Sequence, residues 1–176
     1  FGLDLDRERL TFAAQEDPSS VYIQGDASHL PYRTWGFDLV FCHYLLLWTP
    51  HPLQILQEMK RITRPGGMVM ALAEPDYGSR IDYPEELVRI GKLQRSALIS
   101  QGANPDVGRT LPEFFNQVGL MDVKIGILGS QWDAASISNH WEIEGRILRG
   151  DLENSLSTSE WDHYLTLEQT SRSQGD

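Results

Sequence analysis

The feature that most constrains the fold of this chain is the alternation of short apolar runs with helical patterns over its first two thirds. Strand-like runs are found at 1–5, 21–24, 37–42 and 68–73. Polar, amphipathic stretches separate these runs, and such alternation predicts a parallel sheet covered by helices. The first of these helices is expected over 7–15. We expect the run at 37–42 to be buried on both faces of the sheet, because its apolar character is nearly continuous.

A helix is predicted over 52–63, between the third and fourth strands. Its apolar positions recur three residues apart and form one stripe. They are Leu53, Leu56, Met59 and Ile62. The Arg-Pro-Gly-Gly sequence at 64–67 predicts the end of this helix, because proline cannot continue it and glycine turns the chain.

The last third of the chain has a different character. Alternating apolar residues predict a fifth strand over 122–128. Residues 130–176 have the pattern of two helical pieces. Ser157 and Glu160 have the spacing of a capping box that opens the second piece.

These patterns predict an α/β fold with a doubly wound, mostly parallel sheet of the Rossmann-like type. We expect residues 1–129 to form the α/β core, with a helical insertion at about 82–100, and residues 130–176 to form a helical lid. We also expect the core to be incomplete. The nucleotide-binding fingerprint places a glycine-rich phosphate loop about 20 residues upstream of an acid such as Asp4, and this sequence has none there.

Charge and cysteine content limit the partners of this chain. Its 176 residues include 25 acidic and 15 basic ones, for a formal net charge of −10. An acidic surface repels phosphate backbones and anionic lipids, so we expect neither a nucleic-acid nor a membrane partner. Cys42 is the single cysteine, so no intrachain disulfide can form, which fits a reducing compartment and a cytoplasmic location.

Acidic residues follow the first two predicted strands, at the end where open α/β sheets bind nucleotides. Asp4 ends the first strand, and Asp26 follows the second. A carboxylate offers two acceptor oxygens to the vicinal diol of a ribose, so Asp4 is a candidate ribose ligand and Asp6 is the rival acid. Asp26 has an alternative role in a turn, because Asp-Ala-Ser is favourable turn chemistry.

The ends of the third and fourth strands supply candidate catalytic groups. Histidine titrates near neutral pH, so His43 is a candidate general base, although it also fits a purely structural role. Glu74 follows the fourth strand. It either orients or deprotonates a bound substrate, or it caps the turn that begins there. His43 and His51 suggest a metal pair, but no cysteine or carboxylate completes a ligand set, and we expect no metal.

Four motifs occur in a fixed order between residues 1 and 128. They are Gly-Leu-Asp-Leu-Asp at 2–6, Gln-Gly-Asp-Ala-Ser-His-Leu-Pro-Tyr at 24–32, Phe-Asp-Leu-Val-Phe-Cys at 37–42 and Glu-Met-Lys-Arg-Ile-Thr-Arg-Pro-Gly-Gly at 58–67. In this order and at these separations, they resemble the class I S-adenosylmethionine-dependent methyltransferases, especially those that act on small molecules.

The resemblance implies S-adenosyl-L-methionine as cofactor and assigns residues to its adenosine end. Asp4 is implied to bind both ribose hydroxyls, and Leu5 to lie against the adenine. Asp26 is implied to accept a hydrogen bond from the adenine amino group, and the backbone N–H of Ala27 to reach a ring nitrogen.

The resemblance also places the methionine end and a small-molecule methyl acceptor near the third and fourth strands. A backbone carbonyl of Cys42 or His43 is implied to face the cofactor, and His43 and Glu74 are the candidate catalytic residues. Methyl transfer is an in-line displacement at a sulfonium, so a site of this kind mainly aligns donor and acceptor and excludes water. The need for a proton acceptor depends on the substrate.

Two other functions stay open at the level of sequence. A nicotinamide-dependent oxidoreductase shares the acid after a strand, although the Gly-Asp-Ala run and the Pro-Gly-Gly turn argue against it. A non-catalytic module that keeps this fold is the other alternative, because fold does not imply function. Without the glycine-rich loop, we expect this chain by itself to bind S-adenosylmethionine weakly or not at all.

Overall fold

The computed structural model describes residues 1–82, 85–126, 145–152 and 155–174. The chain divides into two compact units. The first unit comprises residues 1–74 and 107–125, and the second comprises residues 75–106 and 126–176. The segment predicted as an insertion, 82–100, therefore belongs to the same unit as the carboxyl-terminal residues.

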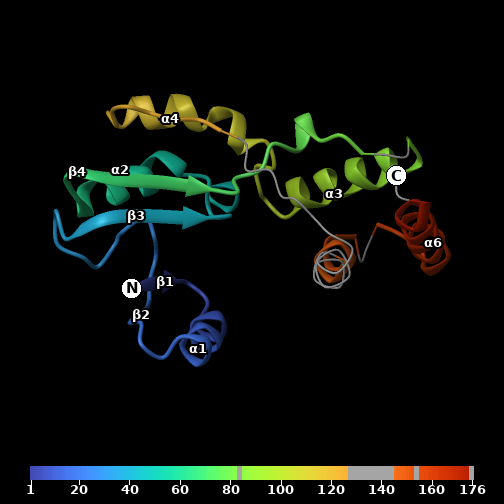
Figure 1. Ribbon diagram of the computed structural model, residues 1–176, viewed down its shortest axis with the longest axis horizontal. Coiled ribbons are helices and arrows are strands. Elements are labelled where there is room, and N and C mark those ends of the chain that lie inside the picture. The colour runs from blue at the N-terminus through green and yellow to red at the C-terminus, as the bar shows by residue number, and fades with distance from the viewer. Residues whose placement is uncertain (83–84, 127–144, 153–154, 175–176) are drawn as a thin grey trace. The chain divides into compact units, whose positions relative to one another are not determined.

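The first unit opens with a parallel strand pair joined by a helix (Figure 1). Strand β1 (Gly2–Asp4) pairs with β2 (Tyr22–Gln24), and helix α1 (Arg7–Glu16) lies between them in the chain. Asp6 is the N-cap of α1, and its carboxylate accepts a hydrogen bond from the N–H of Glu8 at 2.8 Å. The prediction of these two strands and of the helix between them is confirmed.

A second parallel pair follows along the chain. Strands β3 (Phe37–His43) and β4 (Thr63–Leu72) pair in parallel, and helix α2 (Pro52–Ile62) connects them. Pro52 lies at the start of α2, where its fixed φ and missing N–H do not disturb the helix. A short 3₁₀ turn, η1 (Leu46–Trp48), separates β3 from α2.

The glycine-rich turn predicted at 64–67 lies inside β4. The pairing register with β3 jumps between Thr63 and Met68, so the intervening residues bulge out of the ladder. Gly66 in this bulge has a φ of 78°, a backbone conformation that glycine adopts without a steric penalty. The turn is therefore an irregularity within the strand rather than a loop before it.

The two βαβ connections diverge across the unit. In Figure 1, β1 and β3 lie between β2 and β4, and the arrows of β1, β3 and β4 point the same way, while β2 pairs with β1 in parallel. Among the described residues, β1–β2 and β3–β4 form two separate two-stranded sheets. Open parallel α/β folds bind ligands beyond the carboxyl ends of their strands.

Helix α2 covers one face of the β3–β4 pair. Its buried residues are Ile55, Leu56, Met59 and Ile62. Three members of the predicted stripe are thus confirmed, but Leu53 is only half-buried and Ile55 takes its place. Residues one turn apart on the 3.6-residue helix, rather than strictly three apart, share the face that meets the sheet.

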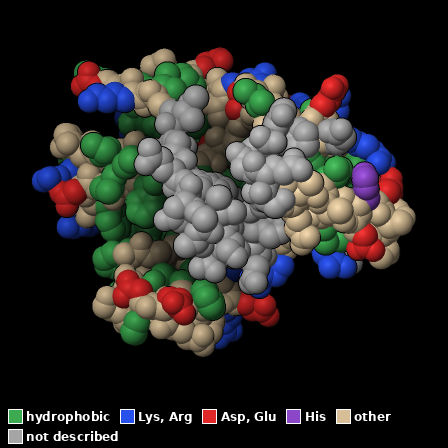
Figure 2. Space-filling model, turned by 45° about the vertical axis from the view of Figure 1, so that its right-hand side comes forward, with side chains coloured by type: hydrophobic (Ala, Val, Ile, Leu, Met, Phe, Trp, Pro, Cys, Tyr) green, Lys and Arg blue, Asp and Glu red, His purple; other side chains and the backbone are tan. Residues whose placement is uncertain are grey.

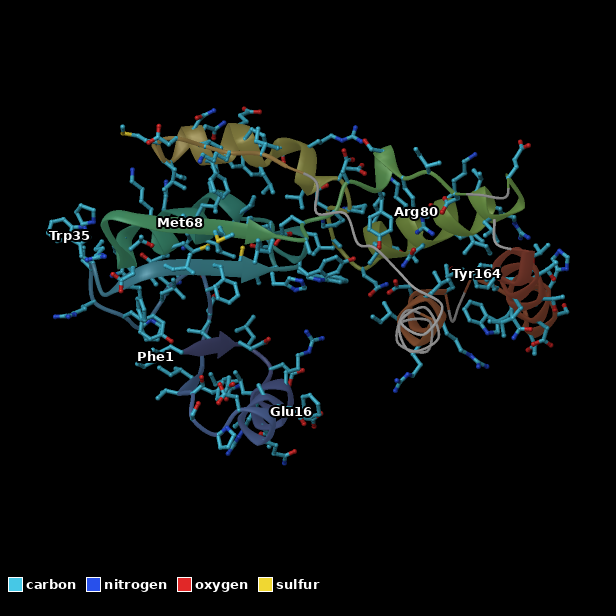
Figure 3. The ribbon with its side chains drawn as sticks, viewed as in Figure 1. Phe1, Glu16, Trp35, Met68, Arg80 and Tyr164 are labelled. Atoms are coloured by element: carbon cyan, nitrogen blue, oxygen red, sulfur yellow. The ribbon has the colours of Figure 1, made fainter. Side chains whose placement is uncertain are left out.

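The other face of the β3–β4 pair is apolar and exposed. Leu39, Phe41 and Met68 have exposed fractions of 47%, 60% and 58%. Figure 2 shows hydrophobic side chains gathered on this part of the surface, and Figure 3 labels Met68 there and Trp35 near the start of β3. The expectation that 37–42 is buried on both faces is therefore wrong within the described part of the chain.

The first unit ends with a helix attached to α2. Helix α4 (Leu111–Gln117) stops before Gly119, whose φ is 70°. The Lys60 ammonium donates hydrogen bonds to the carbonyls of Val118 and Gly119, at 2.6 Å and 2.9 Å. Residues 122–126 have no regular structure, so the described part of the predicted fifth strand is wrong, and residues 127–128 lie outside the described residues.

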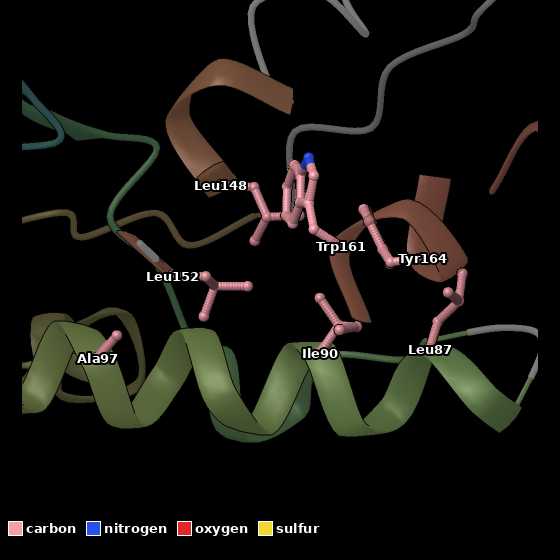
Figure 4. Close-up of a cluster of buried hydrophobic side chains, with 7 residues drawn as sticks. All are labelled: Leu87, Ile90, Ala97, Leu148, Leu152, Trp161 and Tyr164. Atoms are coloured by element: carbon pink, nitrogen blue, oxygen red, sulfur yellow. The ribbon is translucent and has the colours of Figure 1, made fainter. Parts of the chain in front are cut away.

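The second unit is helical. It contains α3 (Val88–Ser100), a helix at 145–152 and α6 (Thr158–Gln174). Their buried side chains form one cluster, drawn in Figure 4: Leu87, Ile90, Ala97, Leu148, Leu152, Trp161 and Tyr164. Short 3₁₀ turns lie at Tyr77–Ser79, Glu85–Leu87 and, in the first unit, Val107–Thr110.

The predicted capping box at the start of α6 is confirmed. The N–H of Ser157 donates to the Glu160 carboxylate at 2.9 Å, and the N–H of Glu160 donates to the Ser157 hydroxyl at 3.3 Å. The bond from the Ser157 N–H, then Arg89 and the Ser157 hydroxyl, which donate to the same carboxylate, lower the pKa of Glu160 to about 2. The capping box thus satisfies the N–H groups of Ser157 and Glu160.

A polar network lies beside the helical cluster. Arg80, labelled in Figure 3, donates to the amide oxygen of Gln94 at 2.6 Å and pairs with Asp82. The amide nitrogen of Gln94 donates to Asp151 at 2.9 Å. Gln94 is buried, and this network supplies the partners that a buried amide requires. None of the described helices is long and apolar enough to cross a membrane.

Candidate cofactor-binding site

Asp4 ends β1 at the carboxyl edge of the first strand pair. Its Oδ1 accepts a hydrogen bond from the N–H of Asp6 at 2.8 Å, while its Oδ2 accepts none from the described residues. The Asp6 carboxylate caps α1 and lies 3.5 Å from the Arg9 Nε. Asp4 thus keeps an acceptor for a ligand, whereas Asp6 is committed to its helix.

The register of the first strand pair brings Asp26 close to Asp4 in the fold. Asp4 pairs with Gln24, and the N–H of Gly25 donates to the Asp4 carbonyl at 3.0 Å. Asp26 is the next residue. The N–H of Ser28 donates to its Oδ1 at 2.8 Å and lowers the pKa of Asp26, so this exposed carboxylate is an ionised acceptor at neutral pH.

Leu5 and Ala27 flank these two acids. The Leu5 side chain is 68% exposed, and its carbonyl accepts a hydrogen bond from the Gln24 amide at 2.9 Å. Ala27 lies in the turn that Asp26 opens and is half-buried. An exposed leucine held beside a carboxylate offers an apolar surface to a flat ring.

An ion pair on α2 braces the loop that follows Asp26. The Arg61 guanidinium donates to the carbonyls of Leu30 and Tyr32, at 2.9 Å and 2.8 Å. Glu58 accepts a hydrogen bond from the Arg61 Nε at 2.7 Å and another from the N–H of Leu30 at 2.8 Å. The hydrogen bond from Arg61 is the main cause that lowers the pKa of Glu58.

Sequence patterns alone assign no role in the site to the Glu58–Arg61 ion pair. Both residues belong to one of the motifs that resemble those of the methyltransferases, and they are named only as part of it. Their opposite charges three residues apart on a helix were the available signal, since such residues lie on one face. The partners at residues 30–32 depend on tertiary contacts.

Cys42 is the buried residue next to the end of β3. It is 7% exposed, and burial, followed by the nearby Glu74 carboxylate, raises the pKa of its thiol to about 12. The thiol is therefore protonated at neutral pH and is a poor nucleophile. His43, the next residue, is exposed and pairs in register with Leu72 of β4.

Glu74 lies two residues beyond β4 and turns back toward β3. Its Oε1 accepts hydrogen bonds from the N–H groups of Leu45 and Leu46, at 2.8 Å and 2.9 Å, and its Oε2 accepts one from Leu47 at 3.2 Å. The Cys42 Sγ lies 3.9 Å from Oε1. Both oxygens are thus engaged, which fits the capping role of Glu74 better than that of a base.

Metal ligands do not gather at this edge in the described part of the chain. There, no three or more His, Cys, Asp or Glu side chains are arranged to hold an ion. The candidate polar groups at this edge are instead the carboxylates of Asp4 and Asp26, which accept hydrogen bonds, and the exposed imidazole of His43.

Comparison with known proteins relates this chain to methyltransferases. Residues 1–71 match a family model described as a methyltransferase domain. An uncharacterized methyltransferase of Schizosaccharomyces pombe is 39% identical over 106 residues, which cover 60% of this chain and 38% of that protein. A demethylmenaquinone methyltransferase of Bacillus pumilus is 29% identical over 140 residues, covering 69% of this chain and 60% of that protein.

A solved structure has the same fold. The crystal structure of an S-adenosylmethionine-dependent methyltransferase from Thermotoga maritima superposes with a TM-score of 0.54 at 16% identity, covering 68% of this chain and 54% of that one. The fold is Rossmann-like and α/β, of the type found in this S-adenosylmethionine-dependent methyltransferase. The methyltransferase-domain model matches residues 1–71 only, and the chain spans 38% and 60% of the two relatives' lengths.

Proposed function

We propose that this chain takes part in methyl transfer from S-adenosyl-L-methionine to a small-molecule acceptor. The observation that carries the proposal is the pair of carboxylates, Asp4 and Asp26, which the parallel register of β1 and β2 brings to one edge. Ribose hydroxyls and an adenine amino group are donors, and ionised carboxylates are acceptors only. A relative named for methylation of demethylmenaquinone supports a small acceptor.

The residues at this edge fit the adenosine end of the cofactor. Asp4 would hold the ribose through its free oxygen, and Leu5 would lie against the adenine ring. Asp26 would accept from the adenine amino group, with the N–H of Ala27 next to it. Arg61 and Glu58 would keep the following loop in place during binding.

The reacting end of the cofactor would lie near the end of β3. When bound, S-adenosyl-L-methionine supplies an electrophilic methyl group on its sulfonium. His43 is exposed there and would take a proton from an acceptor that loses one, whereas buried, protonated Cys42 would contribute only its backbone. The protein would otherwise act by aligning donor and acceptor and by excluding water.

The test is a titration followed by the backbone amide signals in NMR. Because this chain is expected to bind the cofactor weakly at best, S-adenosylhomocysteine is added at millimolar concentration, where it should still shift the signals of Leu5 and of residues 25–27 in the unaltered chain. Asp4→Asn replaces the free acceptor oxygen by a donor and should weaken binding about 10–100-fold, the usual effect of losing a charged hydrogen bond. Asp6→Asn is the matched control, because asparagine caps a helix as well as aspartate does.

Three results would contradict the proposal. Stronger binding of NADH than of S-adenosylhomocysteine would indicate a nicotinamide-dependent oxidoreductase. Equal losses in the Asp4 and Asp6 variants would mean that Asp4 is not the ribose ligand. The absence of any shift with millimolar S-adenosylhomocysteine would indicate a module that keeps the fold without the cofactor.

A further inference from the structure

Strands β3 and β4 are each followed by a non-glycine residue in the left-handed backbone conformation. Strand pairing continues to His43 and Leu72, and the residues that follow, Tyr44 and Ala73, have φ values of 53° and 55°. The N–H of Tyr44 donates to the Leu72 carbonyl at 3.1 Å. Non-glycine residues adopt this left-handed conformation only where surrounding contacts impose it, and such residues concentrate at functional sites.

Glu74 holds the residues that directly follow Tyr44 on the β3 side. Its carboxylate accepts hydrogen bonds from three consecutive backbone N–H groups, those of residues 45–47. Leu46 and Leu47 are fully buried, so their N–H groups have no access to water as a substitute partner. The carboxylate thus joins the end of β4 to the loop that leaves β3.

The loop held in this way carries the side chains closest to the proposed reaction. His43 and Tyr44 lie directly before the three clamped residues, and Trp48 lies directly after them, 44% exposed. Rotation of the loop backbone would redirect Tyr44 and Trp48 and would shift the end of β3, where His43 is the last residue. The three hydrogen bonds to the Glu74 carboxylate oppose this rotation.

We propose that Glu74 is a positioning residue: its carboxylate clamps the backbone of residues 45–47 and thereby sets the direction in which His43 and Tyr44 face the methyl donor and acceptor. The proposal rests on the proposed function and assigns to Glu74 a role different from that of a general base. Its carboxylate already accepts three N–H groups, and protonation would remove the charge that strengthens these hydrogen bonds.

The experiment compares the unaltered chain with Glu74→Gln, Glu74→Asp and a control, Asp38→Asn. The glutamine keeps the shape but presents a donor to one of the three N–H groups, and the aspartate is one carbon too short to reach them. Asp38 pairs with Arg64 on the exposed surface at the other end of β3. Amide hydrogen exchange measures the clamp, and signal shifts with S-adenosylhomocysteine measure positioning.

We expect exchange at residues 45–47 to accelerate at least about tenfold in both Glu74 variants, while exchange at Leu56 in α2 stays unchanged and reports an intact fold. Shifts induced by S-adenosylhomocysteine at His43 and Tyr44 should shrink in these variants and persist at residues 25–27. Asp38→Asn should match the unaltered chain in both measurements.

The outcomes separate the two proposals. Unchanged exchange at residues 45–47 would overturn the clamp. Faster exchange with undiminished shifts at His43 and Tyr44 would make Glu74 merely structural and overturn its positioning role. The absence of shifts in the unaltered chain would refute the proposed function, and with it this role, whatever the exchange rates of the variants.

Discussion

Replacing Leu56 by alanine tests whether the β3–β4 pair is buried on only one of its faces. Leu56 is fully buried on the face of α2 that packs against these strands. The change removes three carbons, worth about 0.8 kcal/mol each, or roughly 2.4 kcal/mol of transfer free energy. Because a cavity remains, the expected loss in the free energy of unfolding is about 3 kcal/mol, within the range of about 2–5 kcal/mol for such changes.

Leu39→Ala is the matched control for this prediction. It removes the same atoms from the opposite face, where Leu39 is 47% exposed and leaves no closed cavity. The expected loss is about 1 kcal/mol, close to half of the transfer free energy. Urea unfolding followed by tryptophan fluorescence measures both values. Equal losses for the two variants would refute the reasoning, since they would mean that another element covers the exposed face in solution.

Two further predictions concern the loop brace and the buried thiol. Arg61→Lys leaves one ammonium for two carbonyls, so hydrogen exchange of the Leu30 amide should accelerate about tenfold. Arg9→Lys on the exposed surface of α1 should leave this exchange rate unchanged. Equal exchange rates in the two variants would contradict the role of Arg61 in holding the loop. Cys42, with a pKa of about 12, should react with iodoacetamide at pH 8 at least about 1000-fold more slowly in the folded chain than in urea, where a free cysteine has a pKa of about 8.5. Because the folded pKa is the higher one, stability should fall as pH rises from about 8.5 toward 12, and a fast reaction of the folded chain would refute the burial of this thiol.

Local sequence patterns were enough to locate the elements that build the candidate site. The alternation of apolar runs and helical stretches predicted β1, α1, β2, β3 and α2, because strand and helix periodicity are properties of neighbouring residues. The acids at the strand ends followed from the same reasoning. Once the strands are parallel, Asp4 and Asp26 must meet at one edge, and they do.

Structural features that depend on residues distant in the sequence were predicted less well. The continuous apolar character of 37–42 suggested burial on both faces, yet exposure depends on what covers a strand and not on the strand itself. The described part of the predicted fifth strand, 122–126, is irregular, because a short alternating run becomes a strand only where a neighbour pairs with it.

The sequence by itself determined the order of the βαβ units and the residue types at their ends. Only the tertiary structure decided what those residues do: Asp6 caps α1 and leaves Asp4 with a free oxygen, and Glu74 holds the backbone beyond β3. The physical reason is that periodicity acts over a few neighbouring residues. Hydrogen-bond partners and burial, in contrast, depend on strand register and on contacts between residues up to 59 positions apart in this unit.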